Sequence, residues 1–193
     1  ELSSIVISPS LGPNLQPAIS SGHPRLIAIA GEIGALYQTE AEIFIGEKVP
    51  GLAAVTAFPR RLLVIDHSLL GESDLALRFL FGYAFEAIRG GYATLLQLGA
   101  RQRRQLGNLL RALLSRAPEL TGSAAEILGS VSPRAQEIIE RHVGVRDVDP
   151  GVWIDGMLAC AKRAGLVACD DFHAAIWTVA LLAGEKLTSH HAT

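Results

Sequence analysis

The sequence has few of the residues that build disulfide frameworks or aromatic binding platforms. Its 193 residues include two cysteines, one methionine, two tryptophans and three tyrosines. Cys160 and Cys169 are too few for a disulfide framework, which favours a reducing compartment, and we expect the cytoplasm. The longest apolar run near the C-terminus, residues 174–184, has about half the length of a membrane-spanning helix. We therefore expect no transmembrane segment.

A strong charge of either sign is also lacking. Lysine and arginine number 17 and aspartate and glutamate 19, which gives a formal net charge of −2. Such a chain has no overall attraction for nucleic acid, and we do not expect nucleic acid as a partner. The hydrophobic fraction of 49% suits one packed domain. We expect an N-terminal arm at residues 1–23, one domain at 24–186 and a loose tail at 187–193.

Residues 73–91 form the clearest predicted element, a buried helix. Ser73 is a good N-cap, and Asp74 places negative charge at the positive end of the helix dipole. Gly90 and Gly91 supply a stop. Apolar residues recur at helical spacing and cover almost the whole circumference, as at Leu77, Leu80, Phe81, Ala84, Phe85 and Ile88. A helix of this kind is normally covered on several sides, so we expect it at the centre of the fold.

The other predicted elements give an α+β fold that is mostly α. A helix at residues 24–37 carries Leu26, Ile29, Ile33 and Leu36 on one face. Three short strands follow, and the arm carries one more candidate; the ranges are 41–46, 51–58, 61–65 and, in the arm, 4–8. Helices then continue to the end, at 92–115, 123–128, 133–142, from Pro150, and from Asp170 or Asp171. The three strands predict a small sheet packed on the central helix within a helical bundle.

The order of these elements and three short stretches carry a family resemblance. Residues 54–59 read AVTAFP, residues 62–66 read LLVID, and residues 77–92 read LRFLFGYAFEAIRGGY. Together they resemble the zinc metallopeptidases of the CAAX-prenyl-protease and heat-shock-protease type, the gluzincins. In that family two strands precede a helix that contains the zinc-binding HExxH motif. Gly82 and Ile88 are among the residues that fit the scaffold part of this pattern.

The zinc-binding residues of the family are replaced in this chain. The resemblance places Tyr83 and Ala87 where the two histidines stand, Ala84 at the catalytic glutamate and Leu158 at the third ligand. A shifted register does not restore the motif, because residues 68–141 contain no histidine. Zinc peptidase chemistry needs two imidazoles one turn apart, a carboxylate base and a third ligand. The resemblance thus implies a pseudoenzyme without a cofactor, which acts as a non-catalytic protein-interaction or scaffold domain.

A hydrolase with a non-standard site is the alternative. Asp66 and His67 lie at a strand-to-helix turn, and Cys169, Asp170 and His173 place metal-ligand types within one short span. No nucleophile pairs with either group in a recognisable motif. Turn and helix-cap roles therefore compete with the catalytic reading at both places. A plain α+β domain without the family link also stays open.

Two features of the sequence suit a protein partner. Arg101, Arg104 and Arg111 fall near one face of the predicted helix at 92–115, opposite a leucine face. They favour an acidic partner or, at a membrane surface, anionic lipid headgroups, although a solvated helix face has the same pattern. The second feature is the sheet edge near Val55 and Ala57, where a partner peptide could add as a strand.

Overall fold

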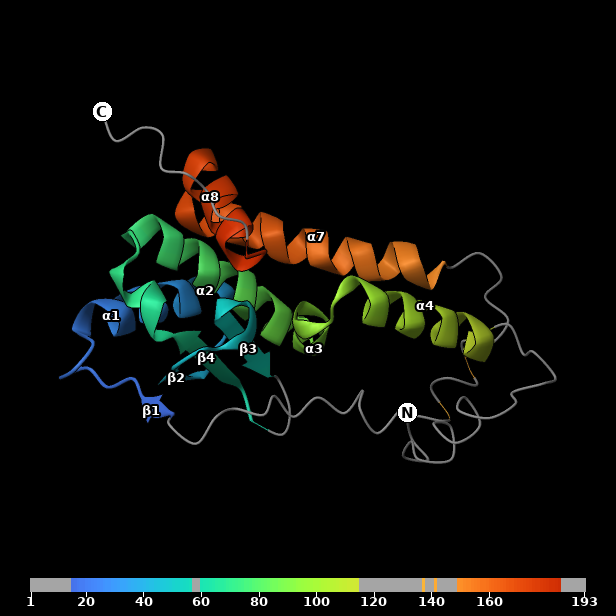
Figure 1. Ribbon diagram of the computed structural model, residues 1–193, viewed down its shortest axis with the longest axis horizontal. Coiled ribbons are helices and arrows are strands. Elements are labelled where there is room, and N and C mark those ends of the chain that lie inside the picture. The colour runs from blue at the N-terminus through green and yellow to red at the C-terminus, as the bar shows by residue number, and fades with distance from the viewer. Residues whose placement is uncertain (1–14, 57–59, 115–136, 138–140, 142–148, 185–193) are drawn as a thin grey trace. The chain divides into compact units, whose positions relative to one another are not determined.

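The computed structural model describes residues 15–56, 60–114, 137, 141 and 149–184 (Figure 1). These residues fall into two compact units. One unit comprises the described residues between Leu98 and Gly156, and the other comprises those before Leu98 and after Gly156. The predicted single domain at 24–186 spans parts of both. The fold class is α+β and mostly helical, as predicted.

The sheet belongs to the unit that contains the N-terminal half of the chain. Its four strands are β1 (Gln16–Pro17), β2 (Glu42–Gly46), β3 (Ala53–Thr56) and β4 (Leu62–Asp66). They lie in the order β1-β2-β4-β3, in which β2 and β4 are parallel and the other two pairs are antiparallel. The prediction of three strands is therefore corrected to four. β1 has only two residues, and one of them is a proline, so it has no alternating pattern from which a strand could be predicted.

The two faces of the sheet are covered differently. On one face Val64, Ala54 and the half-buried Phe44 pack with Val49 and Leu15. Strand side chains alternate between faces, so their neighbours along the strands point the other way, towards the helices (Figure 1). That face carries Val55, Leu63 and Ile65, which are 2%, 0% and 0% exposed. Burial on both faces fits the nearly continuous apolar run of β4, whose residues 63–65 all lie in the core.

Helices make up the rest of the described chain. They are α1 (Pro24–Tyr37), α2 (Asp74–Arg89), α3 (Ala93–Gln97), α4 (Ala100–Leu114), α7 (Pro150–Cys169) and α8 (Phe172–Leu182), with short 3₁₀ turns η1 (Pro50–Leu52) and η2 (His67–Gly71). The predicted helix at 92–115 is wrong as a single element, because it is broken around Leu98 and Gly99 into α3 and α4. No helix in these ranges is both long and apolar enough to cross a membrane.

Some predicted elements cannot be placed. The strand at 4–8 and the helix at 123–128 lie outside the described residues. The helix at 133–142 is described only at Glu137 and Arg141, which are helical and form an ion pair at 2.5 Å.

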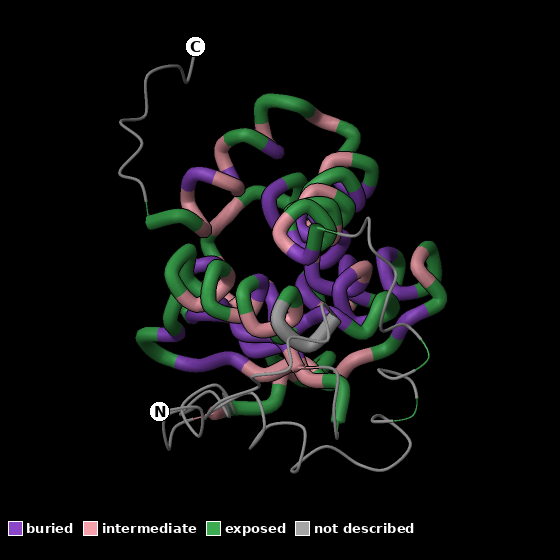
Figure 2. The backbone as a smooth tube through the Cα atoms, turned by 90° about the vertical axis from the view of Figure 1, so that its right-hand side faces the viewer, coloured by how far each residue is buried: buried purple, intermediate pink, exposed green. Residues whose placement is uncertain are grey.

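α2 is the buried helix that the sequence predicts. The Ser73 hydroxyl accepts a hydrogen bond from the Ala76 amide at 3.2 Å and caps the first turn. Gly90 follows the last residue, and Gly91 has a φ of 73° that suits glycine. Ten of its 16 residues are buried (Figure 2), namely Ala76, Leu77, Phe79, Leu80, Phe81, Gly82, Ala84, Phe85, Ala87 and Ile88.

α1 is fastened to α2 by polar contacts as well as by its apolar face. The Arg25 guanidinium donates to the Asp74 carboxylate at 2.5 Å and to the Glu72 carbonyl at 2.5 Å. Arg78 of α2 pairs with Glu32 of α1 at 2.5 Å. The predicted apolar face is buried at three of its four positions, while Leu36 near the end of α1 is 59% exposed.

α2 and the second half of α7 approach each other through small residues. A Cβ placed on Gly82 would lie 2.5 Å from the Ala168 Cβ and 2.8 Å from the Ala164 carbonyl oxygen. A Cβ on Gly165 would lie 2.8 Å from the Phe79 ring. Side chains larger than hydrogen would push these helices apart, so the two glycines set their spacing.

Candidate functional site

The positions that the metallopeptidase resemblance singled out lie in or beside the core. Ala84 and Ala87 on α2 are fully buried, and Leu158 on α7 is 8% exposed. Tyr83 is half-buried and stacks on Phe79, with ring centroids 6.2 Å apart. The side chains at these positions contribute packing surface and offer no metal-binding atom except the Tyr83 hydroxyl.

Tyrosines gather around the C-terminal half of α2. The Tyr37 hydroxyl donates to the Ala164 carbonyl at 2.7 Å, and burial and the negative charge of Glu86 raise the pKa of Tyr37. The Tyr92 hydroxyl is buried without a hydrogen-bond partner among the described residues. Burial, reinforced by Glu86 and Cys160, raises the pKa of Tyr92 far above its usual value. These phenols are thus held protonated, and the Tyr37 hydroxyl ties α1 to α7.

The Asp66 carboxylate is fully engaged in a turn. It accepts from the Val49 amide at 2.7 Å, the Ser68 amide at 3.0 Å and the Ser68 hydroxyl at 2.7 Å. Burial acts to raise the pKa of Asp66, but these hydrogen bonds outweigh it and leave the pKa below the ordinary value. His67 beside it is exposed. The arrangement gives Asp66 a capping role at the start of η2.

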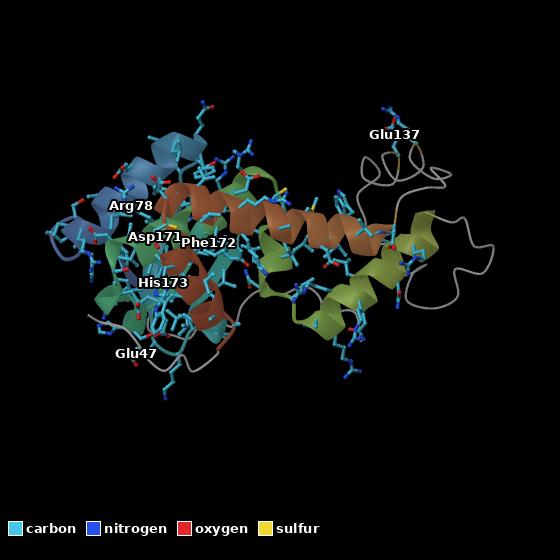
Figure 3. All side chains as sticks on the ribbon, turned by 90° about the horizontal axis from the view of Figure 1, so that it is seen from above. Glu47, Arg78, Glu137, Asp171, Phe172 and His173 are labelled. Atoms are coloured by element: carbon cyan, nitrogen blue, oxygen red, sulfur yellow. The ribbon has the colours of Figure 1, made fainter. Side chains whose placement is uncertain are left out.

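The second group of possible metal ligands lies around Cys169 and His173, and its side chains do not converge on one point. The buried Cys169 thiol donates to the Asp171 carbonyl at 3.2 Å, and burial raises its pKa. The Asp171 carboxylate accepts from the Ala174 amide at 2.6 Å and caps α8. His173 lies exposed at the start of α8, next to Phe172 (Figure 3). Within the described ranges no three histidine, cysteine or acidic side chains come together as a metal site would require.

The arginine face predicted for residues 92–115 lies on α4. Arg101 and Arg104 are exposed. Arg111 pairs with Asp149 at 2.8 Å and contacts Asn108 at 3.0 Å. Exposed pairs of this kind contribute little to stability. Arg111 is therefore already engaged within its own unit, and Arg101 and Arg104 are the more accessible members of the predicted face.

The predicted sheet edge is partly occupied by the chain itself. β3 is an edge strand, but α3 lies against it. The Val55 side chain is 2% exposed, and its carbonyl accepts from the Gln97 side-chain amide. Ala57 lies outside the described residues. Strand addition would have to use backbone groups other than the Val55 carbonyl.

An apolar groove lies between α7 and α8. Its volume is about 400 Å³. Its floor is Phe79 of α2, which packs with Cys169 and Ala175 in a buried cluster. The walls come from the two helices and consist of Lys162, Arg163, Leu166, Phe172, Ala175, Ile176, Val179, Ala180 and Ala183. The large side chains on its rim are not covered, since Phe172 is 70% and Ile176 53% exposed.

This groove arises from the composition of α8. The helix contains no aspartate, glutamate, lysine or arginine. It packs against α2 and buries Ala175, Thr178 and Ala180. Val179 and Leu182 are half-buried against the Phe79 cluster, whereas Phe172 and Ile176 face outwards. Phe172, Ile176 and Val179 recur at helical spacing along α8, and the first two are largely exposed. The absence of charged residues from α8 is a sequence signal for this surface, because a helix that is apolar all round needs more cover than one neighbouring helix provides.

A second concavity lies between α1 and the start of β2. It has a volume of about 690 Å³, and Phe85, Ile43, Glu40 and Arg61 are among the residues that line it. Glu40 and Arg61 are both exposed. Within the described residues these two side chains form no ion pair with each other, so they do not make a charged site there.

No family model, characterised protein or solved structure matches this chain. The metallopeptidase resemblance therefore stays a prediction.

Proposed function

We propose that this protein is a non-catalytic protein-interaction domain whose binding surface is the groove between α7 and α8. The observation that carries the proposal is the exposure of Phe172 and Ile176 at the rim of an apolar groove. Contiguous exposed apolar surface on a folded domain marks interaction sites, because water otherwise covers it at a cost in free energy.

The residues that could have carried catalysis support the same proposal. The carboxylates of Asp66 and Asp171 accept hydrogen bonds from backbone amides at the starts of η2 and α8. A carboxylate that caps a helix in this way has its oxygens directed at backbone amides, which suits it poorly to proton transfer with a substrate. The hydrolase alternative has no comparable observation in its favour.

The proposal extends to the origin of the domain. We infer a metallopeptidase-like scaffold in which Tyr83, Ala84, Ala87 and Leu158 replace the metal-binding and catalytic groups. The burial of both alanines and of Leu158 supports a core that packs without a metal ion. In such a scaffold α2 keeps its central place while binding moves to α7 and α8.

Selection from a phage-displayed peptide library tests the proposed function. Random peptides of about 12 residues, long enough for three helical turns, are panned on the wild-type chain and on the double variant Phe172→Ser, Ile176→Ser. We expect peptides with large apolar side chains to be enriched on the wild type and to lose binding to the double variant. Val167→Ser is the matched control, since Val167 is 67% exposed on α7 but does not line the groove.

Two results would contradict the proposal. One is the enrichment of peptides that bind the double variant as tightly as the wild type. The other is a hydrolytic activity of the purified chain that is lost in Asp66→Asn or His67→Ala. Far-UV circular dichroism of each variant verifies that it is folded.

A further inference from the structure

The charges around the groove indicate which partner it suits. Among the described residues that line it, Lys162 and Arg163 are the charged ones, and both are exposed. Neither forms an ion pair with another residue in the described ranges, whereas Arg25, Arg60, Arg78, Arg89 and Arg111 all do. No acidic residue lines it in the part of the chain that the structure describes. The groove is thus an apolar trough with positive charge on the α7 side.

The shape of the groove favours a helical occupant. The lining residues Phe172, Ile176, Val179 and Ala183 recur at helical spacing along α8, so they form a stripe about 16 Å long at 1.5 Å per residue. Both walls are helices, whose backbone amides and carbonyls already bond within the helix, so the groove has no strand edge to pair with an extended peptide. A helix satisfies its own backbone groups and needs only apolar side chains for the trough.

We propose that the α7–α8 groove binds an amphipathic helix of a partner protein that carries acidic residues beside its apolar stripe. This inference rests on the proposed function and adds the partner's chemistry to it. The apolar stripe of the partner would lie over Phe79, Phe172 and Ile176. Its acidic residues would lie against Lys162 and Arg163, where opposite charge speeds association and selects among partners. Apolar contact provides most of the affinity, and the two basic residues provide specificity for acidic partners.

The proposal is tested with three synthetic helical peptides that share one stripe of leucines. Their polar positions are glutamate in the first, glutamine in the second and lysine in the third. Fluorescein-labelled peptides are titrated with the full chain, and anisotropy gives each Kd at low and at high salt. We expect the glutamate peptide to bind about tenfold more tightly than the lysine peptide at low salt, and the difference to shrink as salt screens the charges.

Variants of the chain assign the two contributions. Lys162→Glu with Arg163→Glu should reverse the order of the peptides while leaving the glutamine peptide unchanged. Phe172→Ser with Ile176→Ser should abolish binding of all three peptides, and Val167→Ser should change none of them.

Each other outcome overturns the inference in a recognisable way. Equal binding of the three peptides, lost in the serine double variant, removes the acidic preference but leaves the proposed function standing. No binding by any of them, while library peptides do bind, removes the helical partner. If sedimentation velocity shows self-association of the wild type and Ile176→Ser abolishes it, the groove is occupied by a second copy of the chain instead. Binding to vesicles of phosphatidylcholine and phosphatidylserine that is lost in the serine double variant would make it a membrane surface.

Discussion

The contact between α2 and α7 gives a stability prediction of defined sign. In Gly82→Ala the new Cβ would lie 2.5 Å from the Ala168 Cβ and 2.8 Å from the Ala164 carbonyl oxygen. Neither neighbour can rotate away, because one is a Cβ and the other is backbone. Overpacking of this kind costs about 1–3 kcal/mol, whereas alanine in place of a helical glycine gains about 1 kcal/mol. Both contacts are closer than 3.0 Å, so neighbouring atoms must shift, and we expect a net loss of up to about 2 kcal/mol.

Gly31→Ala is the matched control. Gly31 lies in α1, is exposed, and has no heavy atom within 4 Å of a Cβ placed there. Only the gain in helix propensity remains, so stability should rise by up to about 1 kcal/mol. Urea denaturation followed by far-UV circular dichroism measures both variants. For a chain of this size each kcal/mol corresponds to roughly 2–4 °C in Tm.

Two residues on α7 repeat the comparison within one helix. A Cβ on Gly165 would meet the Phe79 ring at 2.8 Å, while one on Gly156 would have no heavy atom within 4 Å. Gly165→Ala should therefore destabilise and Gly156→Ala should not. A Gly82→Ala variant as stable as the wild type would refute the reasoning, because α2 and α7 could not then lie as close as the structure places them.

The remaining predictions concern single polar groups. Asp66→Ala should lower stability at pH 7 by about 1–3 kcal/mol, since it leaves the buried Val49 amide unpaired. The pKa of Asp66 is lower in the folded chain than its value of 3.8 in the unfolded chain, so its ionised form stabilises the fold above pH 3.8. This stabilisation is lost as the pH falls through the folded pKa. The stabilities of wild type and variant should therefore converge in acid. Tyr37→Phe should cost about 0.5–1.5 kcal/mol through its lost hydrogen bond, whereas Tyr92→Phe should be neutral or stabilising. The raised pKa of Tyr92 predicts that its ionisation, followed by ultraviolet absorbance, occurs above pH 10 and that the native state loses stability there. With a thiol reagent, exposed Cys160 should react at once and buried Cys169 only on unfolding, so Cys160→Ser should remove the fast phase.

Local signals in the sequence sufficed to predict the elements that they specify directly. Ser73 caps α2 and Asp171 caps α8, because a side-chain oxygen next to an apolar periodic run acts over one turn. Pro24 and Pro150 begin α1 and α7 for the same local reason. The α+β class follows from these elements and from the short apolar strands.

Features that depend on distant partners were not predictable in this way. β1 forms because Gln16 and Pro17 find the edge of β2, and nothing in their own pattern requires a strand. The exposure of Phe172 and Ile176 depends on how much of α8 its neighbours cover, which helical periodicity does not report. The groove therefore emerged only from the packing. The sequence alone gives no reason to single out Lys162 and Arg163, because only the packing shows that they line the groove.

The position of β4 has a consequence for the biosynthesis of the protein. β4 is the last of the four strands along the chain, yet it lies between β2 and β3, which do not pair with each other. While the ribosome is still making the chain, the backbone N–H and C=O groups on one edge of β2 stay unpaired until Leu62–Asp66 is synthesised. Unpaired strands on a nascent chain invite association with other chains. Chains that stop between Thr56 and Leu62 should therefore aggregate or be held by chaperones, and release should coincide with the synthesis of β4 and the helix that follows it.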